Sequence, residues 1–279
     1  MSAMMIGMHS MQLLHADDDI GLTKLFGRHF VSIIVYGKWP TGEPLTASYS
    51  AFVFAAGERW FLLTAGHNIA NWKEAVDKGA IIRGCDLNDA FAGGPHDRTL
   101  PIDTRSDDWL TIYDPKDPSG LDLACAPLAD FHRLALAANG IVPLELGVDF
   151  RRLSRTPCAH LYVTGVPVET TSIKANRLHQ NLCVIPAFGL HDQSVSPALR
   201  HELKRHYGSI HLPGWTSSGL ANIDGMSGGP VFGIWQDQAT QTFDYAAIGI
   251  QSGWDASAKQ IAATPLDAIS RAIAELFGE

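Results

Sequence analysis

The chain has 279 residues, of which 46% are hydrophobic and 18% charged, and its net charge is −8 from 29 acidic and 21 basic residues. A chain of this length can bury about 75% of its unfolded surface, so one or two domains with ordinary hydrophobic cores are expected. The acidic balance, without blocks of like charge, argues against nucleic acid or a membrane as the main partner. No apolar run is long enough to span a bilayer.

The N-terminal segment, residues 1–29, is expected to form an arm outside the main fold. Its Met-rich start has no basic region, no continuous apolar run and no evident cleavage site, so it does not resemble a signal peptide. The four cysteines lie far apart without a C-x-x-C pair; they are Cys85, Cys125, Cys158 and Cys183. This spacing argues against a metal knuckle and favours reduced, mostly buried thiols in a cytoplasmic protein.

Short apolar runs rich in β-branched and aromatic residues follow one another along the chain and predict strands. They cover 30–36, 50–66, 123–128, 160–168, 229–235 and 245–253. Gly, Pro, Asn and Asp separate them, and "AAGE" within the second run predicts a hairpin turn. This spacing favours an all-β sandwich or barrel over alternating β-α-β units.

Three segments carry helical signals. "NIANWKEAVDKG" (68–79) predicts a short helix, and "SPALRHELKRHYG" (196–208) predicts a second one. At the C-terminus Thr264 can act as an N-cap and Pro265 suits the first turn, so residues 264–279 are expected to form a helix. Its apolar stripe is expected to pack onto the barrel.

The segment "IDGMSGGPVFG" places Ser227 between glycines, which suits a tight turn, a nucleophile elbow or another kind of nucleophile loop. A nucleophilic serine needs a base that takes its proton, a partner that orients the base, and donors for the oxyanion. In α/β-hydrolases the histidine follows the serine in the chain. The last of the twelve histidines here is His211, so none follows Ser227 and the elbow is excluded.

A base is available earlier in the chain. "FLLTAGHNIA" places His67 directly after an apolar strand and a tight turn, which can direct an imidazole into a cleft. "GLDLACAPL" places Asp122 inside an apolar strand, where an unpaired carboxylate is costly and an imidazole N–H would satisfy it. Asp114 and Asp117 precede it in a predicted turn and are expected to be solvated.

These motifs together resemble those of the trypsin/chymotrypsin-like serine peptidases. "LLTAGHNI" is similar to the family's TA-x-H segment, "LDLACAPL" to its Asp-hydrophobic-Ala strand, "GMSGGPVFG" to its G-x-S-G-G-P loop, and "AIGIQSGW" to the strand that lines its cleft. The order His67, Asp122, Ser227 is also that of the family. The resemblance extends roughly from residue 30 to the C-terminus.

The resemblance implies an all-β fold of two six-stranded antiparallel β-barrels, with the active site between them and a helix at the C-terminus. The expected division is an arm over 1–29, a first barrel over 30–147, a second barrel over 148–263 and the helix over 264–279. The first barrel would carry His67 and Asp122, and the second would carry Ser227.

The resemblance also implies a role for each matched residue. Ser227 would attack the scissile carbonyl, His67 would take its proton and later protonate the leaving amine, and Asp122 would orient the imidazole. The backbone amides of Gly225 and Ser227 would form the oxyanion hole. Substrate would contact Ala221, Ser252, Gly253 and Trp254, with Ser252 beside Asp122. The implied function is a serine endopeptidase that works through an acyl-enzyme.

Several positions depart from the family pattern. Asn68 stands where secreted members have a cysteine, which agrees with a disulfide-free protein of the bacterial, cytoplasmic type. Met226 replaces the aspartate of animal members, so no trypsin-type zymogen switch is expected. Ala221 does not match the acid with which trypsin-like members select Lys or Arg before the scissile bond. Gln251 does not match the histidine with which glutamyl peptidases select Glu there. Trp254 stands where many members have a glycine, so a small or medium apolar residue is expected before the scissile bond.

A protein or peptide substrate is the expected partner, and a regulatory protein is a second candidate. No metal or other cofactor is expected. In "HELKRH" (201–206) the histidines are five residues apart, whereas a zinc-binding helix spaces them four apart. Two alternatives stay open at this point: a latent or inactive double barrel that serves as a protein-binding module, and an esterase that uses the same triad.

Overall fold

The structure is a computed structural model that describes residues 19–93, 99–145, 160–174, 177–202, 205–210, 220, 222–236, 243–266 and 268. Its α-helices are α1 (Asp19–Gly27), α2 (Gly66–Asp77) and α3 (Asp130–Ala138). Short 3-10 helices cover Ala90–Ala92, Ser106–Asp108, Val168–Thr170, Asp192–Ser194 and Pro197–Leu199. None of the helices in these ranges is long and apolar enough to cross a membrane.

Strands make up most of the regular secondary structure of the described chain and are divided into two halves. The strands of the N-terminal half are β1 (Phe30–Lys38), β2 (Pro44–Ala56), β3 (Arg59–Thr64), β4 (Ile81–Asn88), β5 (Leu100–Ile102), β6 (Leu110–Tyr113), β7 (Asp122–Pro127) and β8 (Leu144–Glu145). Those of the C-terminal half are β9 (His160–Gly165), β10 (Ser172–Lys174), β11 (Arg177–His179), β12 (Cys183–Gly189), β13 (His206–Ser209), β14 (Pro230–Gln236), β15 (Phe243–Asp255) and β16 (Gln260–Pro265).

The C-terminal half is a closed antiparallel barrel with the strand order β12-β13-β16-β15-β14-β9, which confirms one of the two expected barrels. The N-terminal half is an eight-stranded sheet with the order β5-β4-β1-β2-β3-β7-β6, in which β8 pairs with β2. Among the described residues no pairing joins β5 to β6, so a second closed barrel is not confirmed. The predicted hairpin is present as β2 and β3, which turn at Gly57 with φ 58°.

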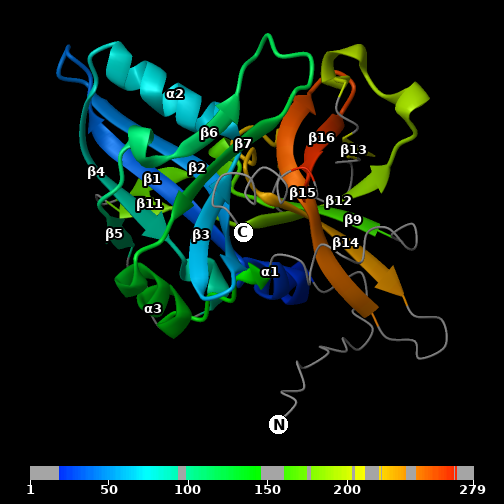
Figure 1. The fold of residues 1–279 in the computed structure, drawn as a ribbon, viewed down its shortest axis with the longest axis horizontal. Helices are drawn as coiled ribbons and strands as arrows, with labels where there is room; N and C mark the ends of the chain where they lie inside the picture. The colour runs from blue at the N-terminus through cyan, green and yellow to red at the C-terminus, as the bar shows by residue number, and fades with distance from the viewer. Residues whose placement is uncertain are drawn as a thin grey trace.

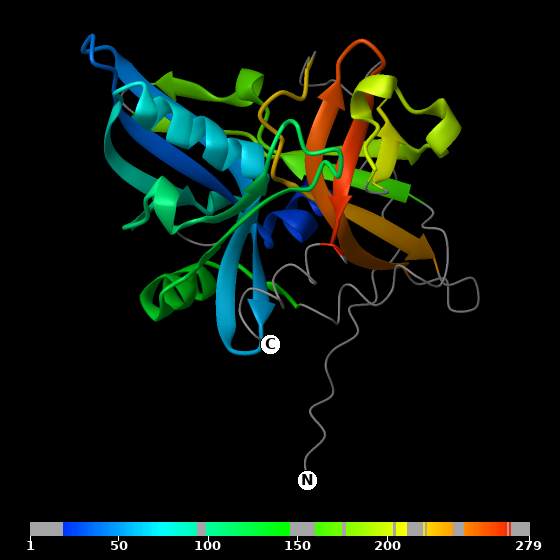
Figure 2. The same cartoon turned by 45° about the horizontal axis from the view of Figure 1, so that its top comes forward.

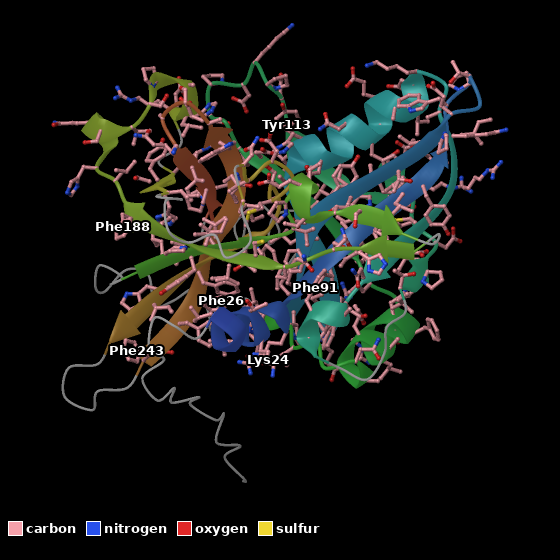
Figure 3. The ribbon with its side chains drawn as sticks, turned by 180° about the vertical axis from the view of Figure 1, so that it is seen from behind. Lys24, Phe26, Phe91, Tyr113, Phe188 and Phe243 are labelled. Carbon is pink, nitrogen blue, oxygen red and sulfur yellow. The ribbon has the colours of Figure 1, made fainter. Side chains whose placement is uncertain are left out.

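The two halves lie side by side, with α1 below the place where they meet (Figure 1). The hydrophobic core continues across this boundary. Phe26 of α1 is fully buried, and its ring stacks on Phe232 of β14 at 4.2 Å between centroids. The same cluster contains Phe52 and Phe54 of β2. Figure 3 shows Phe26 on α1 at this junction. Part of the expected N-terminal arm is therefore a helix whose last turn belongs to the shared core.

Helix α2 packs against β6 and β7, and in Figure 2 it runs in nearly the same direction as the strands β1 and β2. Its buried side chains Ile69 and Trp72 belong to the core of the N-terminal half, which also contains Val31 and Ile33 of β1. This apolar face explains the predicted helix, which begins at Gly66 and so places His67 in its first turn.

One helix prediction is corrected by the structure, and the start of another is moved. In its described residues the segment 196–208 forms a 3-10 turn at Pro197–Leu199 and then strand β13, which pairs with β16 and closes the barrel. There strand pairing overrides the local helix signal. At the C-terminus Thr264 and Pro265 still belong to β16, and Leu266 and Ala268 after them are helical. The other residues of the predicted C-terminal helix lie outside the described residues.

Candidate active site

His67 and Asp122 form a close, buried pair between α2 and β7. The ring Nδ1 of His67 lies 2.7 Å from Oδ2 of Asp122, and the backbone N–H of His67 donates to Oδ1 at 2.9 Å. Asp122 is 4% exposed, whereas the side chain of His67 is 23% exposed. Within the described part of the chain Nε2 of His67 has no hydrogen-bond partner. The carboxylate thus fixes the ring orientation and leaves Nε2 available to another group.

Tyr113 forms one side of this pair. It lies opposite Asp122 in the β6–β7 register, and its ring packs edge-on against His67 at 5.9 Å. Burial raises the pKa of Tyr113, and the negative charges of Asp122 and Asp114 raise it further. The phenol therefore stays neutral near pH 7, where it can shield the Asp122 carboxylate from water.

A polar network ties the segment around Ser227 to the N-terminal half. The side-chain amide of Asn68 donates to the Ser227 carbonyl at 2.7 Å and to Oγ1 of Thr64 at 3.0 Å. Thr64 in turn donates to the carbonyl of Ser50 at 2.7 Å. The hydroxyl of Ser50 donates to the Gly225 carbonyl at 2.9 Å. Because Asn68 directly follows His67, this network ties the Ser227 loop to the helix that carries the imidazole. The described chain contains no hydrogen bond between the Ser227 hydroxyl and Nε2 of His67.

The glycines after Ser227 are required by close packing as well as by backbone conformation. Gly228 has φ +93°, and a Cβ atom there would lie 2.1 Å from Oγ1 of Thr64 and 2.3 Å from the Ser50 carbonyl. A Cβ on Gly229 would lie 1.9 Å from the Thr164 carbonyl. No side chain fits at these distances, so the loop can dock against β2, β3 and β9 only with glycine at both positions.

Two backbone amides in this loop are available for an anion. Gly225 has φ +93°, and neither its N–H nor that of Ser227 has an acceptor in the described part of the chain. The loop itself is anchored: Gly228 donates to the Gln251 carbonyl at 2.8 Å, and Gln251 donates to the Gly229 carbonyl at 2.9 Å. Fixed, unpaired N–H groups beside a partly exposed serine are the donors that an oxyanion needs.

The predicted substrate strand, residues 252–254, lies in β15 next to an irregularity in its pairing with β16 between Gln251 and Gly253. The hydroxyl of Ser252 contacts Oγ1 of Thr264 at 2.9 Å, and the described chain contains no Ser252–Asp122 hydrogen bond. The indole N–H of Trp254 donates to Oδ1 of Asn222 at 2.9 Å. Ala221 lies outside the described residues.

Sequence reasoning found the His67, Asp122 and Ser227 motifs but missed the residues that connect them. Ser50, Thr64 and Asn68 are buried polar residues next to apolar strands. Their positions in otherwise apolar runs were the available signal, because a buried polar side chain is normally hydrogen-bonded.

The described residues contain no group of three or more His, Cys, Asp or Glu side chains that could hold a metal ion. Cys85, Cys125 and Cys183 are free thiols. Burial raises the pKa of Cys85 and Cys125 to about 12 and that of Cys183 to about 11. These thiols are therefore protonated near neutral pH. Cys158 lies outside the described residues.

The fold and the site together define a β-barrel protein with an oriented His–Asp pair and a glycine-flanked serine loop that Asn68 ties to the helix of that pair. The chain matches no protein-family model and no curated protein sequence. Among solved structures it is similar to the Rv3671c protease from M. tuberculosis in its active form. The identity is 16%, the match covers 91% of this chain and 82% of that chain, and the TM-score is 0.44. Residue roles at this level of similarity depend on the geometry of this chain itself.

Proposed function

We propose that this protein is a serine endopeptidase with a trypsin-like arrangement of its catalytic groups. The observation that carries the proposal is the hydrogen bond from Asn68 to the Ser227 carbonyl, because it ties the serine loop to the helix whose His67 is oriented by Asp122. The two free amides of the same loop support it as well.

In the proposed reaction the hydroxyl of Ser227 attacks the scissile carbonyl while Nε2 of His67 takes its proton. Asp122 stabilises the imidazolium, and the amides of Gly225 and Ser227 bind the oxyanion. The C–N bond then breaks, and His67 gives the proton to the leaving amine. A water molecule next attacks the acyl-enzyme, again with His67 as base, and releases the acid product and free Ser227.

The proposed substrate is an extended peptide that adds to residues 252–254 of β15 as a further strand. Asn222 stands five residues before Ser227 in the chain, and its hydrogen bond with Trp254 fixes the large indole ring at that point. We therefore propose a small apolar residue directly before the scissile bond. A cytoplasmic location is part of the proposal, and the free thiols Cys85, Cys125 and Cys183 support it.

Active-site labelling with a fluorophosphonate tests the proposal directly. The wild type should be labelled at Ser227 alone, as located by peptide mass mapping. Ser227→Ala should abolish labelling, and His67→Ala should slow it by about 10⁴-fold or more. The matched controls Ser257→Ala, at an exposed position, and His132→Ala, at a half-buried position in α3 away from the pair, should be labelled like the wild type. Equal labelling of the His67→Ala variant and the wild type would refute the assignment.

The second candidate function is a latent module that binds a protein without cleaving it. The specific observation that favours it is the Trp254–Asn222 hydrogen bond, because a tethered indole can close a pocket as well as narrow it. Trp254→Gly distinguishes the two. If the indole ring closes the site, only the Trp254→Gly variant should react with fluorophosphonate. If the protein is the proposed peptidase, both the wild type and Trp254→Gly should react.

A further inference from the structure

Arg205, directly before β13, is a buried cation. Its residue is 6% exposed, and its Nε is fully shielded from solvent without a hydrogen bond. In the described part of the chain no acceptor or carboxylate pairs with this guanidinium. Arginine stays charged in proteins, and a buried charge without a partner is destabilising. Such a group needs an explanation, and a ligand that arrives later is a physical one.

The guanidinium lies against the predicted substrate strand. Nη1 of Arg205 is 3.8 Å from the position that a Cβ on Gly253 would occupy. Leu199 and Ala262 line the same space, at 3.0 and 3.4 Å from that position. Because Gly253 has no side chain, the guanidinium, Leu199 and Ala262 can all pack close to the backbone of the predicted substrate strand. Arg205 therefore lies beside the strand to which a peptide is proposed to add.

Asp122 acts on Arg205 through its charge, but in the described chain it forms no ion pair or hydrogen bond with the guanidinium. Both carboxylate oxygens of Asp122 are already bonded to His67. Burial lowers the pKa of His201, and the charge of Arg205 lowers it further, so His201 is neutral near pH 7. Tyr207 is the remaining ionisable neighbour. The guanidinium donors therefore stay available to a further carboxylate.

We propose that Arg205 binds an acidic side chain of the substrate, so that the enzyme selects peptides with Glu or Asp at the second, third or fourth residue before the scissile bond. A carboxylate is the planar acceptor that the guanidinium fork fits best. This inference rests on the proposed function, because it names the substrate class of the same site.

The test uses the tetrapeptide Ac-Ala-Ala-Ala-Ala-aminomethylcoumarin. In each test peptide one of the three alanines farthest from the coumarin is replaced by Glu or by Gln. Cleavage is measured with the wild type, and equilibrium binding is measured separately with Ser227→Ala. At one position Glu should be preferred over Gln by about tenfold or more in both measurements, since charged hydrogen bonds have this strength. Arg205→Met, which keeps the aliphatic volume, should remove the preference and leave the Gln peptide unaffected.

Two further variants keep the result interpretable if Arg205→Met is unstable. Arg205→Lys keeps the charge and should retain part of the Glu preference, and Arg133→Met in α3 removes a distant charge and should retain all of it. Three outcomes overturn the inference. They are equal cleavage and binding of the Glu and Gln peptides, no detectable binding of the Glu peptides, and a Glu preference that persists in Arg205→Met. Cleavage without Glu preference would overturn it and leave the proposed function intact. A Glu preference in binding without cleavage or fluorophosphonate labelling would overturn only the proposed function.

Discussion

The side chain of Asn68 donates a hydrogen bond to the backbone carbonyl of Ser227 at 2.7 Å, although the two residues lie 159 positions apart. This bond joins the helix that carries His67 to the loop that carries the serine. It acts on backbone, so it fixes the path of the loop and leaves the Ser227 hydroxyl free for chemistry. Asn68 is therefore a positioning residue in the proposed mechanism.

Asn68→Ala should weaken both stability and reactivity. The substitution leaves the Ser227 carbonyl and the Thr64 hydroxyl without their donor, which costs about 1–3 kcal/mol of unfolding free energy. Reactivity should fall through kcat more than through KM, because the serine is misplaced while the substrate strand stays intact. Urea unfolding and fluorophosphonate labelling rates measure the two effects. Asn71→Ala, at an exposed position of the same helix, is the control and should change neither.

Gly228→Ala should be among the most damaging single substitutions. A methyl group there would lie 2.1 Å from the side-chain oxygen of Thr64 and 2.3 Å from the backbone oxygen of Ser50, so the loop must move away from β2 and β3. We expect a loss of more than about 3 kcal/mol of unfolding free energy.

Gly42→Ala is the matched control for Gly228→Ala. Gly42 has nearly the same φ, +90°, but nothing lies within 4 Å of its Cβ position. Its cost should be only the conformational strain of about 1–2 kcal/mol. Similar unfolding free energies for the two variants would show that the close approach at Gly228 does not matter.

Phe26→Ala should destabilise the whole fold. Phe26 is fully buried and stacks on Phe232, so it is the α1 side chain that lies deepest in the core shared by both halves, with Leu22 and Leu25 packed at the edge of that core. Removal of a buried phenylalanine costs about 3–5 kcal/mol. Phe131→Ala, at a position 69% exposed, should cost less than about 0.5 kcal/mol. A small effect of Phe26→Ala in chemical unfolding would mean that α1 is a detachable part of the arm.

The buried thiols should make stability fall at alkaline pH. The pKa of Cys85 and of Cys125 is raised to about 12 in the folded chain, compared with about 8.5 in an unfolded one. Their contribution is therefore complete below about pH 8.5 and is lost as the pH rises from there towards the folded pKa. The double variant Cys85→Ala/Cys125→Ala should lose less unfolding free energy than the wild type between pH 8 and 10. Parallel pH profiles for the two proteins would contradict this.

The same raised pKa values predict slow alkylation of the native protein. Few thiolates are present at pH 7, so iodoacetamide should react with Cys85 and Cys125 only after unfolding. The experiment is done in Cys158→Ser, which removes the cysteine outside the described residues. Rapid modification of either residue in the folded state would show that the thiol is exposed.

Local patterns in the sequence predicted a large part of the β-structure. The run Phe61 to Thr64 became β3, and the run that follows Asp122 became β7, because long apolar stretches with tight turns have few other stable arrangements. The helix after His67 was also predicted, since its apolar positions repeat with helical spacing. The helix predicted over 196–208 was wrong, because pairing of β13 with β16 outweighs the helix propensity of this segment.

The sequence by itself determined which residues can carry the proposed chemistry: His67 after an apolar strand, Asp122 within one, and Ser227 among glycines. Only the tertiary structure decided which distant groups meet. Asn68 reaches the Ser227 loop, Phe26 reaches Phe232, and Arg205 reaches Gly253. Propensity and periodicity act over a few neighbouring residues, whereas these contacts depend on how two β-structures and a helix pack together, and packing is a property of the whole chain.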